Sequence, residues 1–187
     1  MVQLKIMEKL KTWSDVIGTW VTIIGALTGG GFALVQYTDQ IASARVQETL
    51  KYVERFSSDP LQKASMHLDA FWNPRAEEVF NKSAEGETVL FKYLNSAIRD
   101  NHNHLEGDTN RLLAFYETLR TCTCAKLCDN ESTVKFFGKQ AFDSYGILFP
   151  YISSQRDRLK DNSFGTGMES LAKNYRNKEK YAYCPIS

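Results

Sequence analysis

The most constraining feature of the sequence is a run of 23 residues without a charged side chain, from Val16 to Thr38, with an aspartate on each side. At about 1.5 Å per residue, a helix of this length spans a hydrocarbon core of roughly 30 Å. The run therefore predicts a single N-terminal transmembrane helix over residues 16–38, preceded by a short tail of residues 1–15.

Two other interpretations of the run are a cleaved signal peptide and a buried helix of a soluble protein. Ala42-Ser43-Ala44 fits a small-residue cleavage site, and the chain starts with basic residues. However, the run is about twice as long as a typical signal-peptide core, and the cleavage site lies beyond Asp39. Buried helices rarely stay uncharged around their whole circumference for this length. The sequence thus favours a retained membrane anchor.

Small residues within the run share one face of the expected helix. Gly18, Gly25 and Gly29 fall within about 40° of one another at 100° per residue, and Gln36 continues the same stripe. Small residues let membrane helices approach closely, whereas glycine is also simply common in membrane helices. We expect this stripe to pack against a second copy of the chain or against a partner membrane helix.

The rest of the chain has helical periodicity almost throughout and no alternating segment that requires a sheet. It predicts an all-α protein: an amphipathic stalk helix at 39–56, a bundle of about six helices at 57–175 and an irregular tail at 176–187. Proline and capping residues predict helix starts at Asp59, at residues 73–74 and at Asp129.

Composition and motifs exclude several classes of function. The formal net charge is only +1, so nucleic-acid binding has no electrostatic basis. The sequence contains no P-loop, G-x-S-x-G, H-E-x-x-H or dinucleotide-binding fingerprint. We therefore expect a non-catalytic protein without a cofactor.

One loop could hold a metal ion. Asp100, His102, His104, Glu106 and Asp108 alternate along the chain, and an extended backbone would place them on one side. The spacing matches no established zinc motif, and loops commonly collect solvated polar residues. The sequence therefore predicts no metal site, with these last four residues as the candidates if one exists.

The four cysteines bear on the compartment of the domain. Cys122, Cys124 and Cys128 crowd at one expected helix end and Cys184 lies in the tail, which does not resemble a disulfide framework. We expect free thiols and a cytoplasmic C-terminal domain. The last four residues also match the outline of a prenylation motif, although the chain already has an expected anchor.

Charge alone does not orient the anchor. Three basic residues lie close to the run on each side: Lys5, Lys9 and Lys11 before it, and Arg45, Lys51 and Arg55 after it. Because basic residues favour the cytoplasmic side, these two groups balance, and only the expected free thiols favour a cytoplasmic C-terminal domain.

Three segments carry a resemblance to a known family. They are the helix of residues 112–119, the Cys128-Asp129 turn, and the aromatic helix that ends in residues 149–152. With the N-terminal membrane helix, they resemble a bacterial family of membrane-anchored helical domains of unknown function. The resemblance implies a cytoplasmic helical domain and brings no catalytic residues.

These observations favour a single-pass membrane protein that acts as an interaction or signalling module, with the lipid bilayer and a second copy or another membrane helix as partners. Two alternatives remain open. One is a membrane-active effector whose transmembrane helices associate on stimulation, and the other is a metal-dependent enzyme that uses the loop of residues 100–108.

Overall fold

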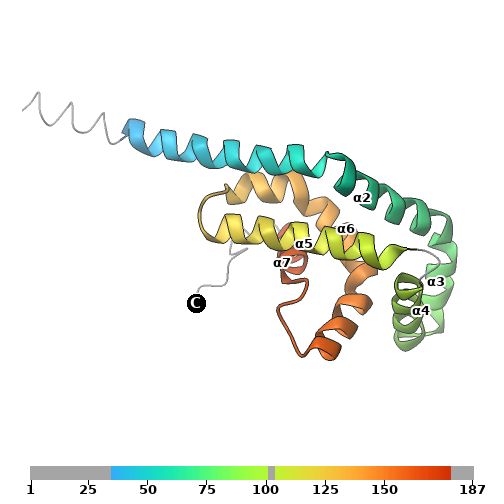
Figure 1. The fold of residues 1–187 in the computed structure, drawn as a ribbon. Coiled ribbons are helices and arrows are strands. Elements are labelled where there is room, and N and C mark those ends of the chain that lie inside the picture. The colour runs from blue at the N-terminus through green and yellow to red at the C-terminus, as the bar shows by residue number, and fades with distance from the viewer. Residues whose placement is uncertain (1–34, 101–103, 178–187) are drawn as a thin grey trace, which may run out of the picture. The chain divides into compact units, whose positions relative to one another are not determined.

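The computed structural model describes residues 35–100 and 104–177, and every regular element in these ranges is a helix (Figure 1). In chain order the elements are a helical segment at residues 35–56, α2 (Asp59–Trp72), the 3-10 helix η1 (Asn73–Arg75), α3 (Ala76–Glu85), α4 (Glu87–Arg99), α5 (Leu105–Cys124), α6 (Asn130–Leu159) and α7 (Thr166–Asn177). The prediction of an all-α fold is confirmed for this part of the chain.

The predicted membrane helix at 16–38 lies outside the described residues, except for positions 35–38. The stripe residues Gly18, Gly25 and Gly29 therefore also lie outside the described residues, whereas Gln36 is helical and exposed. Among the helices that the structure describes, none combines the length and the apolar character needed to cross a membrane.

The chain divides into two compact units, Met1–Ala44 and Arg45–Ser187. In the first unit, residues 35–44 are helical and mostly exposed. In the second unit, residues 45–56 are helical and contribute side chains to the core. Much of the segment predicted as a stalk therefore belongs to the helical domain itself.

α5 is the central helix of the second unit and packs against α2, α4, α6 and α7. Its largest buried side chains recur at helical spacing: Leu112, Phe115, Tyr116 and Leu119. The centroid of the Phe115 ring lies 5.1 Å from the centroid of the Phe56 ring and 5.5 Å from that of the Phe137 ring. These aromatic contacts join residues 45–56 and α6 to the central helix.

The helix starts follow capping rules with small shifts from the sequence-based expectation. α6 begins as predicted, because the Asp129 side chain accepts a hydrogen bond from the Ser132 N–H at 2.8 Å. The predicted cap Asp59 lies inside α2, and Ser58 holds the N-cap position instead. Residues 73–74 start the short η1 rather than an α-helix.

Two glycines allow α7 to lie close to its neighbours. A Cβ atom at Gly167 would come within 2.4 Å of the Tyr116 carbonyl oxygen, and one at Gly138 within 2.9 Å of the Tyr175 ring. The Glu117 carboxylate accepts a hydrogen bond from the Gly167 N–H at 2.6 Å, and so pairs one of the backbone N–H groups that have no partner within the first turn of α7. This packing sets the position of the turn that connects α6 to α7.

Candidate functional site

The first candidate region is the start of α5, where the sequence suggested metal ligands. Glu106 lies in the first helical turn and accepts hydrogen bonds from the Tyr151 hydroxyl at 3.0 Å and the Gln155 side-chain amide at 3.2 Å. Both donors come from α6 and are buried. This carboxylate therefore connects the start of α5 to the C-terminal part of α6.

The other suggested ligands do not converge on Glu106. Asp108 contacts the His67 Nδ1 atom and the Arg111 Nη1 atom, each at 2.7 Å. Residues two positions apart along a helix differ by about 200° in direction, so the extended backbone that would place Glu106 and Asp108 on one side does not occur here. His104 precedes the helix in a left-handed conformation, with φ of 52°.

His102, the fourth candidate, lies outside the described residues. Within the described part of the chain, no group of three or more histidine, cysteine, aspartate or glutamate side chains is arranged to hold a metal ion.

Beside this region, a cavity of about 550 Å³ lies between α5, the end of α6 and the α6–α7 turn. Arg158 lies at its wall, and its Nε atom donates a hydrogen bond to the side-chain oxygen Oε1 of Gln155 at 2.8 Å. Gln155 in turn is held by Glu106. The cavity is thus lined by the guanidinium of Arg158, by the carboxylates of Glu117 and Asp161, and by apolar side chains that include Leu113 and Phe164.

The cavity does not contain an activated nucleophile. The Ser163 hydroxyl donates a hydrogen bond to Asp161 Oδ1 at 2.7 Å, and the Ser163 backbone N–H donates to the same oxygen at 2.8 Å. This pair of bonds closes a local turn. The hydroxyl and the backbone N–H of Ser163 both lower the pKa of the Asp161 carboxyl, which makes it a weaker base. Among the described residues that line the cavity there is no histidine or cysteine.

A second surface feature is a row of aromatic side chains that crosses α4, α6 and α7. Phe142 and Phe149, two turns apart on α6, are 42% and 41% exposed. The Phe142 ring lies 6.0 Å from Tyr175, and the Phe149 ring lies 5.7 Å from Tyr145 and 6.5 Å from Phe91. These five residues are here called the aromatic row; Phe142, Phe149 and Tyr175 are exposed to solvent, whereas Phe91 and Tyr145 are partly buried.

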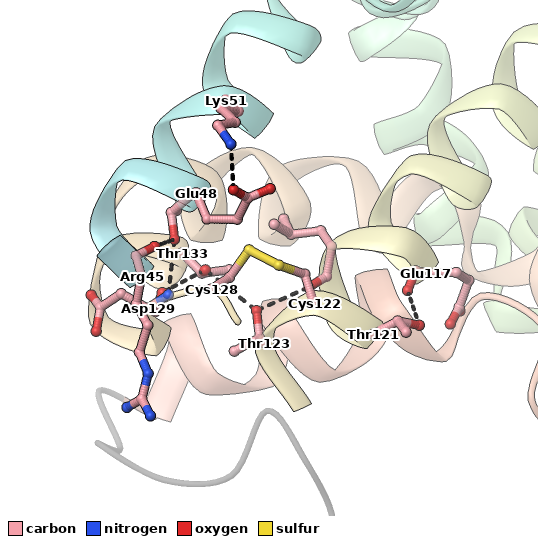
Figure 2. The surroundings of a disulfide bond; sticks show 12 residues. Arg45, Glu48, Lys51, Glu117, Thr121, Cys122, Thr123, Cys128, Asp129 and Thr133 are labelled. Carbon is pink, nitrogen blue, oxygen red and sulfur yellow. Dashed lines mark hydrogen bonds and ion pairs between the residues drawn. A yellow bond between two sulfur atoms is a disulfide. The ribbon is translucent and has the colours of Figure 1, made fainter. Parts of the chain in front are cut away.

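The third feature is a disulfide between Cys122 and Cys128 at the end of α5 (Figure 2). Both residues are buried, and their Cα atoms are 5.2 Å apart. Cys124 is also disulfide-bonded, and no described cysteine is free. The prediction of free thiols was therefore wrong for these residues. Cys184 lies outside the described range.

The disulfide forms because α5 ends where the sequence suggested that the helix could continue. α5 stops at Cys124, and Lys126 adopts a left-handed conformation with φ of 58°. The backbone N–H groups of Leu127 and Cys128 then donate back to the Cys122 carbonyl at 3.0 and 3.1 Å. A spacing of six residues thus closes a turn, which helical spacing alone did not indicate.

The same turn holds the helix at residues 45–56. The Asp129 N–H donates to the Thr49 hydroxyl at 2.9 Å and also to the Arg45 carbonyl at 3.3 Å. Thr49 is completely buried, and its hydroxyl donates to the Arg45 carbonyl at 3.0 Å. Figure 2 shows Arg45 and Asp129 beside the disulfide. The turn from Cys122 to Asp129 is here called the cysteine turn.

The central α5, the surrounding helices and the disulfide-closed turn define a small all-helical domain. Residues 23–175 match the family described as Domain of unknown function (DUF4760), and the chain belongs to this family. The expected resemblance to a family of helical domains of unknown function is confirmed at this level. No curated protein and no solved structure matches the chain.

Proposed function

We propose that this protein is a single-pass, membrane-anchored interaction module whose helical domain binds a second copy of the chain without catalysing a reaction. The uncharged run at 16–38 supports the anchor, because its length suits a bilayer. The carboxylates of Glu106 and Asp108 support a non-catalytic domain, since both are engaged in hydrogen bonds between helices or ion pairs.

The observation that carries the proposal is the aromatic row. Phe142 and Phe149 remain more than two-fifths exposed although they lie on the longest helix that the structure describes. Exposed apolar patches on soluble surfaces mark interaction sites, and aromatic side chains supply much of the energy of protein interfaces. The row therefore offers a surface that a partner would cover.

A second copy is the partner that the sequence supports. The stripe of Gly18, Gly25 and Gly29 would let two anchors pack against each other. Once two anchors are held in one membrane, the effective concentration of their domains reaches the millimolar range for short linkers. Weak contacts between two aromatic rows are then sufficient for association.

The proposal can be tested by crosslinking the full chain in native membranes. Replacing Phe142 and Phe149 together with serine should lower the yield of crosslinked dimer, because two half-exposed rings are removed from the surface. The matched control replaces Phe80 and Phe136, which are 70% and 46% exposed and lie outside the row, with serine. Equal loss from both double variants, or no loss from either, would contradict a dimer surface at the row.

The anchor itself has a separate test. The full chain should stay in the membrane pellet after extraction at alkaline pH, which removes peripheral proteins. Placing lysine at both Ile24 and Leu27, in the middle of the run, should release it, because each charge at the bilayer centre costs about 2.5–3.5 kcal/mol. A wild-type chain that is extracted without detergent would refute the anchor.

A further inference from the structure

We propose that the helical domain matures in an oxidising compartment outside the cytoplasm, so that the anchor keeps only the N-terminal tail in the cytoplasm. The compartment is inferred from the disulfides of the described domain. The orientation rests in addition on the membrane anchor proposed above. The cytoplasmic placement expected from the sequence depended on free thiols, and the domain has none among its described cysteines.

The Cys122–Cys128 bond is built into the fold. The two residues are 6% and 3% exposed, and the backbone of Leu127 and Cys128 closes the turn onto the Cys122 carbonyl. The N–H of the next residue, Asp129, binds the buried Thr49. A pair of thiols on a mobile surface loop would lack these contacts. The disulfide therefore belongs to the folded domain and to the attachment of the helix at residues 45–56.

Cys124 provides a second, separate observation, because it is exposed and yet also disulfide-bonded. Disulfides persist in secreted and extracytoplasmic domains, whereas the glutathione and thioredoxin systems keep cytoplasmic thiols reduced. Three bonded cysteines on one turn of a small domain are typical of an exported protein.

Formation of the bond needs an oxidant, which we assign to the class of disulfide-carrying thiol oxidoreductases. The thiolate of one cysteine attacks the oxidant's disulfide, forms a mixed disulfide and releases one oxidant thiol. The thiolate of the second cysteine then displaces the other oxidant sulfur. The domain loses two electrons and two protons, and the oxidant leaves as a dithiol.

The charges that flank the run are compatible with this orientation. Lys5, Lys9 and Lys11 would remain on the cytoplasmic side, as the positive-inside rule favours. An equal number of basic residues follows the run, so charge does not decide the matter. The disulfides support this orientation instead, because their formation depends on the redox state of the compartment and not on the balance of charges.

The test uses the full chain in bacterial cells with two reporters fused after Ser187. Alkaline phosphatase needs an oxidising compartment, and green fluorescent protein fluoresces when it folds in the cytoplasm. We expect active phosphatase and a dark fluorescent fusion. The same reporters fused before Met1 serve as the control and should give the reverse pattern.

The thiol state is measured on the same chain after acid quenching. Cys122 and Cys128 peptides should escape alkylation until reductant is added, and they should become alkylated in cells that lack the thiol oxidant. A fluorescent C-terminal fusion, or alkylation of these cysteines without reductant, would overturn the proposal. A protected, exported domain that washes off the membrane would instead refute the anchor and leave the compartment standing.

Discussion

The two ends of α5 differ in a way that spacing along the chain does not reveal. At the start, five polar residues at alternate positions suggested a shared site, yet Glu106 turns to α6 and Asp108 turns to His67. At the end, three cysteines suggested separate free thiols, yet Cys122 and Cys128 are joined. The same helix disperses the first group and assembles the second.

What a spacing between residues indicates depends on where a helix begins and ends. Alternate residues share a side only in an extended chain, and α5 already includes Glu106. Residues six apart do not share a helical face, but they can meet across a tight turn, and α5 ends at Cys124. An error of a few residues in a helix boundary therefore reverses the interpretation of both motifs.

The largest expected effect is at the cysteine turn. Replacing both Cys122 and Cys128 with serine should lower the free energy of unfolding by about 2–3 kcal/mol, because a short cross-linked loop restricts the unfolded chain. Urea unfolding of residues 45–187 measures this loss. Each single variant should cost nearly as much as the pair, since either one removes the bond. Small, additive losses would mean that the bond contributes little to the domain.

At the start of α5, Tyr151→Phe removes the hydroxyl that binds Glu106 and should cost about 1–2 kcal/mol of stability. Thermal unfolding measures the change. Tyr175→Phe is the control, because that residue is 38% exposed and surface changes usually stay within about 0.5 kcal/mol. A neutral Tyr151→Phe variant would show that the contact between α5 and α6 does not depend on this hydroxyl.

The same tyrosine predicts a pH dependence. Burial raises the pKa of Tyr151 to about 12, whereas the pKa of a tyrosine in the unfolded chain is about 10. The folded state therefore keeps a proton that the unfolded state loses, and stability should fall as the pH rises from about 10 towards 12. Denaturant unfolding across this range should show a shallower fall for Tyr151→Phe. Parallel curves for the two proteins would contradict the assignment.

A smaller effect is expected where the cysteine turn starts α6. Asp129→Ala removes the side-chain cap and should cost about 1 kcal/mol, while Asp129→Asn should cost less because asparagine also caps helices. Circular dichroism during thermal unfolding measures both. Equal losses from the two variants would indicate that the charge of Asp129 matters more than its hydrogen bond to Ser132.

The smallest expected effect is that of added metal. A site occupied at a hundred times its Kd would stabilise the domain by about 2.7 kcal/mol. We expect no shift in melting temperature with Zn²⁺, because Glu106 and Asp108 point to different partners. A clear shift that disappears when His102 and His104 are replaced with alanine would restore the metal-dependent alternative.

Local patterns sufficed for much of the fold. The all-α class, the start of α6 at Asp129 and the buried Phe115 and Leu119 of α5 follow from helical spacing and capping chemistry. The candidate surfaces were harder to predict. The aromatic row combines residues from three helices, and no periodicity along one helix can indicate that Phe91 meets Phe149 or that Phe142 meets Tyr175.

The sequence alone determined the all-helical class of the described domain and the start of α6 at Asp129, because helical spacing and capping depend on neighbouring residues. The tertiary structure decided which distant groups meet: Tyr151 with Glu106, and Thr49 with Asp129. Such pairs depend on how helices pack and where turns reverse the chain. The disulfide at the end of α5 is the example with the most consequence, because it depends on a turn that helical periodicity does not encode.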